Sequence, residues 1–289
     1  MACNITAVVT AYRRIEQTLA TVKKIKACDP RPDEILVHVD ANQVQCEIAI
    51  RQAFPDVTIL RSNDSIGPGG GRNKLIAGAK NEIVASFDDD SYPLDLDYFS
   101  RIKALFEMFP EATVLCAQVY HLGETLADAT YSAQWVSDFI GCGCVYRRSS
   151  FLATEGYVPL PIAYDMEEVD LAIRLHAVGG KILRSPWLRV FHDTDRKRHA
   201  SPQITASSIA NLALRAYLRY PVVLWILGVG QVFSRIIWLI KHGRFKGIIT
   251  GLSMIPSHIF ANRQYRQCLN TKSVISYLRL RRFPIIALR

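Results

Sequence analysis

The stretch Ile83-Val84-Ala85-Ser86-Phe87-Asp88-Asp89-Asp90-Ser91 decides how the rest of this chain is interpreted. Its apolar half, interrupted by one serine, is typical of a strand buried in a parallel sheet. In open α/β sheets, ligands bind beyond the carboxyl ends of the strands, so the three carboxylates are expected to face a site. Adjacent acids repel one another, and a hard divalent cation such as Mg²⁺ or Mn²⁺ relieves that repulsion most simply. Taken alone, the stretch is also compatible with an acidic turn that caps a helix starting near Leu96.

Strand and helix patterns alternate on both sides of this stretch. This alternation, with short connections, predicts a doubly wound, mostly parallel α/β sheet. A glycine-rich segment, residues 67–73, is expected to be a loop that leads into a helix, and residues 121–140 are expected to be irregular. The expected strands include residues 5–10, 34–39, 57–60 and 114–120, and the expected helices include 44–54, 96–108 and 166–175.

Charge is distributed very unevenly along the chain. Residues 1–195 contain all 26 acidic side chains and 19 Lys or Arg, whereas residues 196–289 contain 16 Lys or Arg and no acid. The two parts carry −7 and +16, which together give the net charge of +9. A basic, apolar tail of this kind indicates an anionic partner, such as a membrane surface, a nucleic acid or an acidic polymer.

The seven cysteines are scattered, and none has the spacing of a zinc-binding set. The apolar segment at residues 5–10 is too short for a signal peptide and is followed by two arginines. We therefore expect the first part of the chain to face the cytosol with reduced thiols.

Several motifs occur in a fixed order along the first part of the chain. They are Val-Val-Thr-Ala-Tyr at 8–12, Asp40 at a strand end, Gly-Arg-Asn at 71–73, Asp-Asp-Asp at 88–90, Glu-Glu-Val-Asp-Leu at 167–171 with Arg-Leu at 174–175, and His192. In this order and spacing the chain resembles the family 2 glycosyltransferases, which have the GT-A fold. The resemblance covers residues 4–193.

The resemblance implies transfer of a hexosyl or deoxyhexosyl group from a nucleotide-diphospho-sugar, with UDP-, GDP- and dTDP-sugars all open as donors. The leaving diphosphate develops charge that a Mn²⁺ or Mg²⁺ ion can stabilise. By the same resemblance, the metal ligands are Asp88, Asp90 and His192, for which an ordinary strand-end histidine is the alternative. The implied donor-binding residues are Thr10, Tyr12, Asp40, Arg72, Asn73, Asp88 and Asp89.

The attacking hydroxyl of the acceptor needs a general base within hydrogen-bond reach. Glu168 occupies the place of the family's base, at the first turn of a helix, although many relatives have aspartate there. Adjacent helical residues lie about 100° apart, so Glu167 and Glu168 are not expected to reach the same proton. Direct displacement with one base implies inversion at the anomeric carbon. Asp170 and Arg174, four residues apart, are expected to form a structural pair.

The tail contains apolar stretches that are shorter than a clean membrane span. Residues 220–234 lack charge, but Arg235 follows, and a span needs about 20 apolar residues. Tryptophans and flanking basic residues favour a monotopic helix in the headgroup region. A spanning segment, or core helices of an accessory domain, remain alternatives. We divide the chain into a GT-A domain at 1–195, with halves 1–120 and 121–195, and a basic amphipathic helical tail at 196–289.

The sequence thus predicts an inverting, metal-dependent, bacterial-type glycosyltransferase that works at the cytoplasmic face of a membrane. A lipid-linked saccharide is the expected acceptor, because the tail would bring the site to a bilayer. One alternative is a soluble acceptor, with the tail used for a homodimer. Another is a non-catalytic nucleotide-sugar-binding membrane protein, against which the intact acidic motifs argue. Nucleic-acid binding is not expected, because the cations of the tail alternate with long apolar runs.

Overall fold

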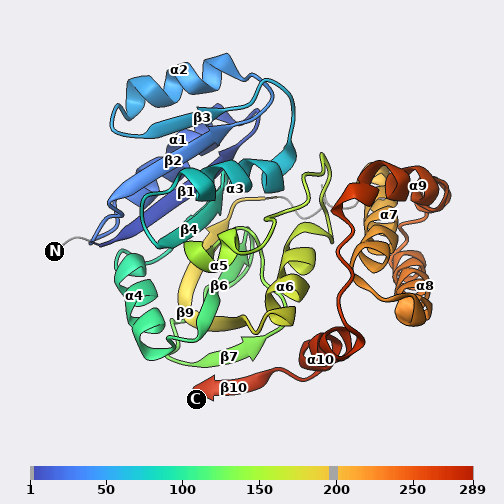
Figure 1. Cartoon of the computed structure of the whole chain (residues 1–289). Helices are drawn as coiled ribbons and strands as arrows, with labels where there is room; N and C mark the ends of the chain where they lie inside the picture. The colour runs from blue at the N-terminus through green and yellow to red at the C-terminus, as the bar shows by residue number, and fades with distance from the viewer. Residues whose placement is uncertain (1–2, 195–200, 289) are drawn as a thin grey trace.

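A computed structural model describes residues 3–194 and 201–288, and its strands form one mixed sheet crossed by helices on both faces (Figure 1). The strand order is β10-β7-β9-β6-β8-β4-β1-β2-β3, and β5 pairs with β9. The strands are β1 (Ile5–Ala11), β2 (Glu34–Val39), β3 (Thr58–Arg61), β4 (Ile83–Asp88), β5 (Ser91–Pro93), β6 (Ala112–His121), β7 (Ala133–Val136), β8 (Cys144–Arg147), β9 (Lys181–His192) and β10 (Ile285–Leu288).

The helices divide between the faces of the sheet according to their buried apolar side chains. One core contains side chains of α1, α2 and α4, and the other contains side chains of α3, α5, α6, α7 and α10. The helices are α1 (Ile15–Lys26), α2 (Val44–Ala53), α3 (Gly67–Gly78), α4 (Tyr98–Met108), α5 (Arg148–Leu152), α6 (Glu167–Ala177), α7 (Pro202–Arg219), α8 (Trp225–Lys241), α9 (Ile248–Asn262) and α10 (Thr271–Arg282), with 3₁₀ turns η2 (Val222–Leu224) and η3 (Arg263–Tyr265).

The first half of the sheet confirms the expected parallel arrangement. Strands β3, β2, β1 and β4 run parallel, and the register places Thr10 of β1 opposite Asp88 of β4. The carboxyl ends of these strands therefore meet at one edge, as expected for a ligand site. Buried valines and isoleucines fill these strands, since both faces of the sheet are covered.

The second half of the sheet is mixed. Strand β8 runs antiparallel between β4 and β6, whereas β6 and β9 pair in parallel. The segment 121–140, expected to be irregular, contains β7, which pairs with β9. The tail is also not wholly helical, because its last strand, β10, adds to β7 at the sheet edge (Figure 1). Strands β7 and β10 are set by pairing over long sequence distances, which local patterns do not report.

The glycine-rich segment expected to be a loop forms the first turns of α3. Asp40 caps this helix from the end of β2, because its carboxylate accepts the backbone N–H groups of Ile66 (3.0 Å) and Gly67 (3.2 Å). Gly67 has φ of +70°, and a Cβ there would lie 2.3 Å from the carbonyl oxygen of Leu160. The glycines thus permit close backbone approach within a helix.

Helix α7 is the central helix of the tail. It is largely buried, and α8 and α9 pack against it through small residues. A Cβ on Gly228 of α8 would lie 2.4 Å from that of Ala216, and one on Gly251 of α9 would lie 2.7 Å from the carbonyl oxygen of Ala206. Leu214 and Leu218 of α7 join a core with residues 158–166. The tail is therefore packed against the segment that precedes α6.

Candidate active site

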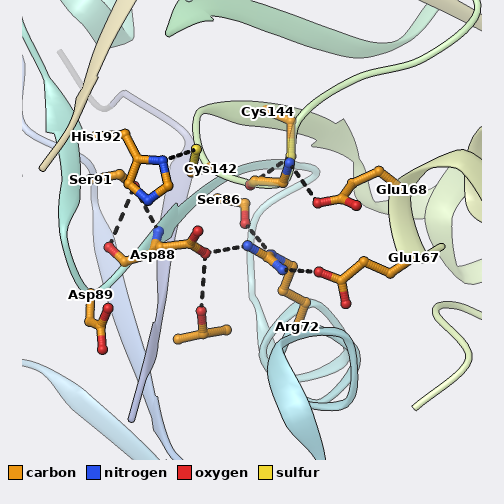
Figure 2. A network of polar contacts seen from close by, with 12 residues as sticks. Arg72, Ser86, Asp88, Asp89, Ser91, Cys142, Cys144, Glu167, Glu168 and His192 are labelled. Carbon is orange, nitrogen blue, oxygen red and sulfur yellow. Dashed lines mark hydrogen bonds and ion pairs between the residues drawn. The ribbon is translucent and has the colours of Figure 1, made fainter. Parts of the chain in front are cut away.

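Arg72 lies at the centre of a buried polar network at the carboxyl end of β4 (Figure 2). Its guanidinium donates to the hydroxyl of Ser86 (3.1 Å), to a carboxylate oxygen of Glu167 (2.9 Å) and to Asp88 Oδ1. Burial disfavours its charge, but the carboxylates of Asp88 and Glu167 raise its pKa well above the usual value. The side chain is 1% exposed, so it joins the acidic strand end to helix α6.

The three consecutive aspartates point to different partners. Asp88 is the most exposed, and Thr10 lies 3.4 Å from its Oδ1. Asp89 accepts the backbone N–H of Tyr12 (3.1 Å), and burial raises its pKa to about 7 against the opposing effect of Arg14. Asp90 is 3% exposed and is held between Arg14 and His192. Of these three aspartates, only Asp88 is thus presented to a ligand.

His192 lies at the end of β9 and faces the acidic strand end (Figure 2). Its Nε2 is 3.1 Å from Asp90 Oδ1, and its Nδ1 is 3.5 Å from the sulfur of Cys142. Burial disfavours the charged ring, but the hydrogen bond to Asp90 prevails and raises its pKa. Ligand atoms of Asp88, Cys142 and His192 all lie within 4.8 Å of one another. These residues fit a divalent cation, because they offer oxygen, sulfur and nitrogen ligands around one point.

Glu167 and Glu168 begin α6, and their carboxylates point to different partners: Glu167 accepts from Arg72, whereas Glu168 faces the turn that carries Cys142 (Figure 2). Glu168 is half-buried and accepts the backbone N–H of Gly141 at 3.0 Å. Burial and the neighbouring Glu168 raise the pKa of Glu167 to about 8, and burial also raises the pKa of Glu168. A raised pKa makes a carboxylate a better proton acceptor near neutral pH. The Glu168 carboxylate is therefore suited to general-base chemistry.

The remaining residues expected at the donor site occupy the ends of β1 and β2 and the start of α3. Tyr12 is 41% exposed and packs beside the guanidinium of Arg13. Asp40, besides capping α3, accepts the hydroxyl of Ser65 at 3.0 Å. Asn73 makes two hydrogen bonds with the backbone of Tyr157, at 2.8 and 2.9 Å. Of these side chains, that of Tyr12 is the most open to a ligand.

Two residues of this site were not among those expected from the sequence. Arg14, one of the arginines that follow β1, bridges Asp89 (3.2 Å) and Asp90, and their carboxylates raise its pKa although burial opposes its charge. Cys142 lies beside His192, and burial raises its pKa well above the usual value. The sequence offered only two hints of these site residues: Arg14 follows the first strand, and Cys142 stands between two glycines. Neither signal identifies its partner, which lies 50 or more residues away.

The C-terminal helices carry many exposed apolar side chains on α8, on α9 and in the segments between them. By length and composition, Val222–Lys241 is the one helical stretch of the described residues able to cross a membrane. Arg235, which interrupts it in sequence, is turned toward the protein and pairs with Asp165. The more exposed of these side chains include Val223, Ile226, Phe233, Ile237, Phe245, Ile249 and Phe260.

Part of this chain is similar to a known family, and its fold is similar to that of several solved structures. The model of the family described as glycosyl transferase family 2 matches residues 6–135. No curated protein matches the sequence. The mannosyltransferase PcManGT from Pyrobaculum calidifontis, solved with GDP-Man and Mn²⁺, superposes with a TM-score of 0.58 and 14% identity, covering 91% of this chain and 73% of that one.

Two further solved structures show the same fold at low identity. GalNAc-T7, solved with UDP, GalNAc and Mn²⁺, has a TM-score of 0.56 and 14% identity over 73% of this chain and 47% of its own. TarS from S. aureus has a TM-score of 0.51 and 13% identity over 73% of this chain and 40% of its own. At these identities the likeness establishes the fold alone.

Proposed function

We propose, from the premise that this chain is a glycosyltransferase of the GT-A fold whose residues 6–135 match family 2, that it catalyses an inverting, metal-dependent transfer at a membrane surface. The proposed donor is a nucleotide-diphospho-sugar, and the proposed acceptor is a lipid-linked saccharide. The observation that carries the proposal is the convergence of Asp88, His192 and Glu168 at the end of β4 (Figure 2). These residues come from three distant parts of the chain.

The donor side of the site is proposed to lie along the ends of β1, β2 and β4. Two of the similar structures hold Mn²⁺, one with GDP-Man and the other with UDP. By analogy we propose Mn²⁺ or Mg²⁺ here, which when bound stabilises the charge of the departing diphosphate. Asp88, Asp90 and His192 form its proposed surroundings. The residues proposed to form the donor site are Thr10, Tyr12, Asp40, Arg72, Asn73, Asp88 and Asp89, of which Tyr12 and Asp88 are the most open to a direct contact.

Arg72 is proposed to act on the donor through Asp88 rather than by direct contact. Its three partners occupy the guanidinium, and its exposure of 1% leaves no open face for a diphosphate. The pair holds the Asp88 carboxylate in one orientation, with Thr10 on the same oxygen. An oriented carboxylate binds a ligand without the entropy cost of ordering a free side chain.

Glu168 is proposed to take the proton from the acceptor hydroxyl. The backbone N–H of Gly141 holds one of its oxygens, and a Cβ on Gly141 would lie 2.6 Å from that oxygen. Glycine at this place therefore lets the backbone hold the base in position. With one base and direct displacement, the anomeric configuration inverts.

Membrane attachment is proposed through the exposed faces of α8 and α9. Buried Gly228, Val232 and Leu239 recur at helical spacing and face α7, while the opposite side of α8 carries the exposed apolar residues. Since Arg235 is paired within the protein, the outward face has little charge to keep it in water. Basic residues of the tail would add attraction to anionic lipid. This arrangement favours a monotopic attachment, which we propose to be at the cytoplasmic face.

The membrane proposal is tested by flotation with vesicles of phosphatidylglycerol and phosphatidylcholine. Wild type should float, and Ile226→Asp combined with Ile249→Asp should stay in the soluble fraction, because both side chains are exposed and apolar. Leu122→Asp is the control, since Leu122 is also apolar and 73% exposed but lies in the GT-A domain, outside the tail. Equal flotation of the double variant and the control would show that α8 and α9 do not contact the lipid.

The chemistry is tested with a panel of UDP-, GDP- and dTDP-sugars in the presence of Mn²⁺. A true donor stabilises the protein by about 2.7 kcal/mol at a hundredfold excess over Kd, which a thermal shift detects. The selected donor is then assayed with lipid-linked and soluble saccharide acceptors. Transfer to soluble acceptors alone would contradict the membrane acceptor and leave the reaction class intact.

A further inference from the structure

We propose that the C-terminal helices position the catalytic base by holding the two segments on which it depends, residues 162–166 and 137–141. This inference rests on the proposed role of Glu168 and specifies what holds that side chain in place. The first segment leads directly into α6, which carries Glu168 in its first turn. The second ends at Gly141, whose backbone N–H binds the Glu168 carboxylate at 3.0 Å. The positioning residues are Arg235 of α8 and Tyr277 of α10.

Residues 162–166 are docked on the tail immediately before α6 begins. The side chains of Ala163 and Met166 are buried in a core that they share with leucines of α7. The buried amide of Asn211, also on α7, donates to the backbone carbonyls of Ile162 (3.1 Å) and Tyr164 (2.8 Å). The tail therefore sets the path of the chain into α6.

Asp165 adds a charged contact between this segment and α8. Its carboxylate pairs with Arg235, and its backbone carbonyl accepts a hydrogen bond from Arg215 of α7 at 3.4 Å. Asp165 has φ of +62°, a backbone conformation that is uncommon for residues other than glycine. Such a conformation persists only where surrounding contacts hold it. Arg235 therefore helps to fix the turn that aims Glu168, three residues further along the chain.

The second segment, residues 137–141, is held by α10. One carboxylate oxygen of Asp138 accepts a hydrogen bond from the hydroxyl of Tyr277, and the other lies 3.2 Å from Nε of Arg281. Tyr277 is 1% exposed, so this hydrogen bond lies inside the contact between α10 and the GT-A domain. Gly141 follows Asp138 by three residues and presents its N–H to the base. Helix α10 thus holds the turn that binds the base.

The two segments act on Glu168 at different points, one on its backbone and the other on a carboxylate oxygen. A general base must lie within hydrogen-bond reach of the proton that it takes. A misplacement of about 1 Å can cost about 10²-fold in rate. Neither segment contains a residue proposed for the donor site. Loss of either tail contact should therefore lower kcat and leave donor affinity unchanged.

The test compares Arg235→Gln and Tyr277→Phe with the wild-type full-length protein in one detergent. Sugar transfer is measured with the selected donor and acceptor, and donor binding is measured separately. Each variant should lower kcat by about 10–10²-fold, because the base is displaced but still present. The Kd of the donor should stay within about twofold of wild type, since uncoupled sites differ little in binding.

Two control variants remove the same chemical groups elsewhere in the tail. Arg263→Gln is the control for Arg235→Gln, because Arg263 is exposed and donates to the carbonyl of Phe260, within the tail itself. Tyr217→Phe is the control for Tyr277→Phe, because the ring of Tyr217 packs beside Trp225 of α8. Both controls should keep the wild-type kcat.

The dependence on Glu168 separates positioning of the base from general damage to the fold. In the Glu168→Gln background no base is left to be placed. Adding Arg235→Gln or Tyr277→Phe should therefore lower the residual rate by less than about twofold, because groups that act as a unit are not additive. Independent structural damage would lower the rate by the same factor in both backgrounds.

Amide hydrogen exchange reports the two segments without turnover. Arg235→Gln should speed exchange about tenfold in residues 162–168, and Tyr277→Phe should do so in residues 137–141, as expected for loss of one hydrogen bond. The proposal is overturned if exchange in these segments is unchanged, if kcat stays at the wild-type value, or if the losses multiply with that of Glu168→Gln.

Failure of this inference can be told apart from failure of the proposed function. If Glu168→Gln is impaired but Arg235→Gln and Tyr277→Phe keep the wild-type kcat, the reaction stands and the tail does not position its base. If Glu168→Gln transfers sugar at the wild-type rate, the base assignment fails and this inference fails with it. If wild type uses no nucleotide sugar, the proposed function fails, and the exchange rates still decide whether the tail holds the two segments.

Discussion

Replacement of Arg219 by methionine should destabilise the protein more than the loss of any exposed ion pair. Arg219 of α7 donates to Asp170 of α6 through Nε (2.5 Å) and Nη2 (3.0 Å), and through Nη1 to the carbonyl of Tyr265 (3.0 Å). Asp170 is fully buried and Arg219 is 1% exposed. This pair joins the tail to the helix that carries Glu168.

The size of the effect follows from what remains around Asp170 after the substitution. Arg174 keeps its two contacts with Asp170, at 2.8 and 3.1 Å, so the carboxylate is not left alone. Breaking a buried pair costs about 3–5 kcal/mol, and the remaining arginine places this case near 3 kcal/mol. That corresponds to about a hundredfold change in the folding equilibrium. Arg219→Lys, which retains the charge but not the fork, should fall between wild type and Arg219→Met.

Urea unfolding of wild type and each variant in the same detergent, monitored by tryptophan fluorescence, measures this difference in unfolding free energy. Arg281→Met is the matched control. Arg281 of α10 also joins the tail to the GT-A domain, because its Nε lies 3.2 Å from Asp138 Oδ2, but its side chain is 45% exposed. Its loss should cost about 0–1 kcal/mol. If Arg219→Met and Arg281→Met unfold at the same urea concentration, the buried pair does not hold α7 on α6, and the reasoning fails.

Three further predictions concern the carboxylates of α6 and the glycine beside them. Glu168→Gln should lower sugar transfer by about 10²–10⁴-fold with donor binding unchanged, since the amide cannot accept the proton; near wild-type transfer would exclude Glu168 as the base. The Glu167 carboxyl has its pKa raised to about 8, so the folded state binds more protons than the unfolded state between pH 4.5 and 8, and stability falls as pH rises through that window. Glu167→Gln should therefore gain unfolding free energy relative to wild type from pH 5 to pH 9 in urea titrations; a constant difference would contradict the raised pKa. Gly141→Ala should lower the turnover number and leave the fold intact by circular dichroism, because the added Cβ meets the Glu168 carboxylate at 2.6 Å and the Arg72 guanidinium at 2.8 Å; unchanged turnover would show that this close approach is not needed.

The local sequence determined the parallel half of the sheet and the residue types of the site. In apolar runs such as Ile83–Phe87, side chains on both faces of the strand are buried, so consecutive apolar residues are enough to predict the strand. The i, i+4 pairing of Asp170 and Arg174, expected from helical spacing, is confirmed at 2.8 Å. Asp88 was predicted to lie at a ligand site only because it follows an apolar strand directly in the sequence. These features depend on neighbours within one element, which periodicity reports.

Tertiary structure alone decided which of these residues meet. Arg14 and Cys142 lie beside Asp90 and His192 only because β1, β8 and β9 are brought to the end of β4. The same packing buries Arg219 on Asp170, at 49 residues' separation, where the sequence pattern showed only a basic tail. Contacts across such distances depend on strand order and on helix docking. Those are properties of the whole core, and no short stretch of the chain contains them.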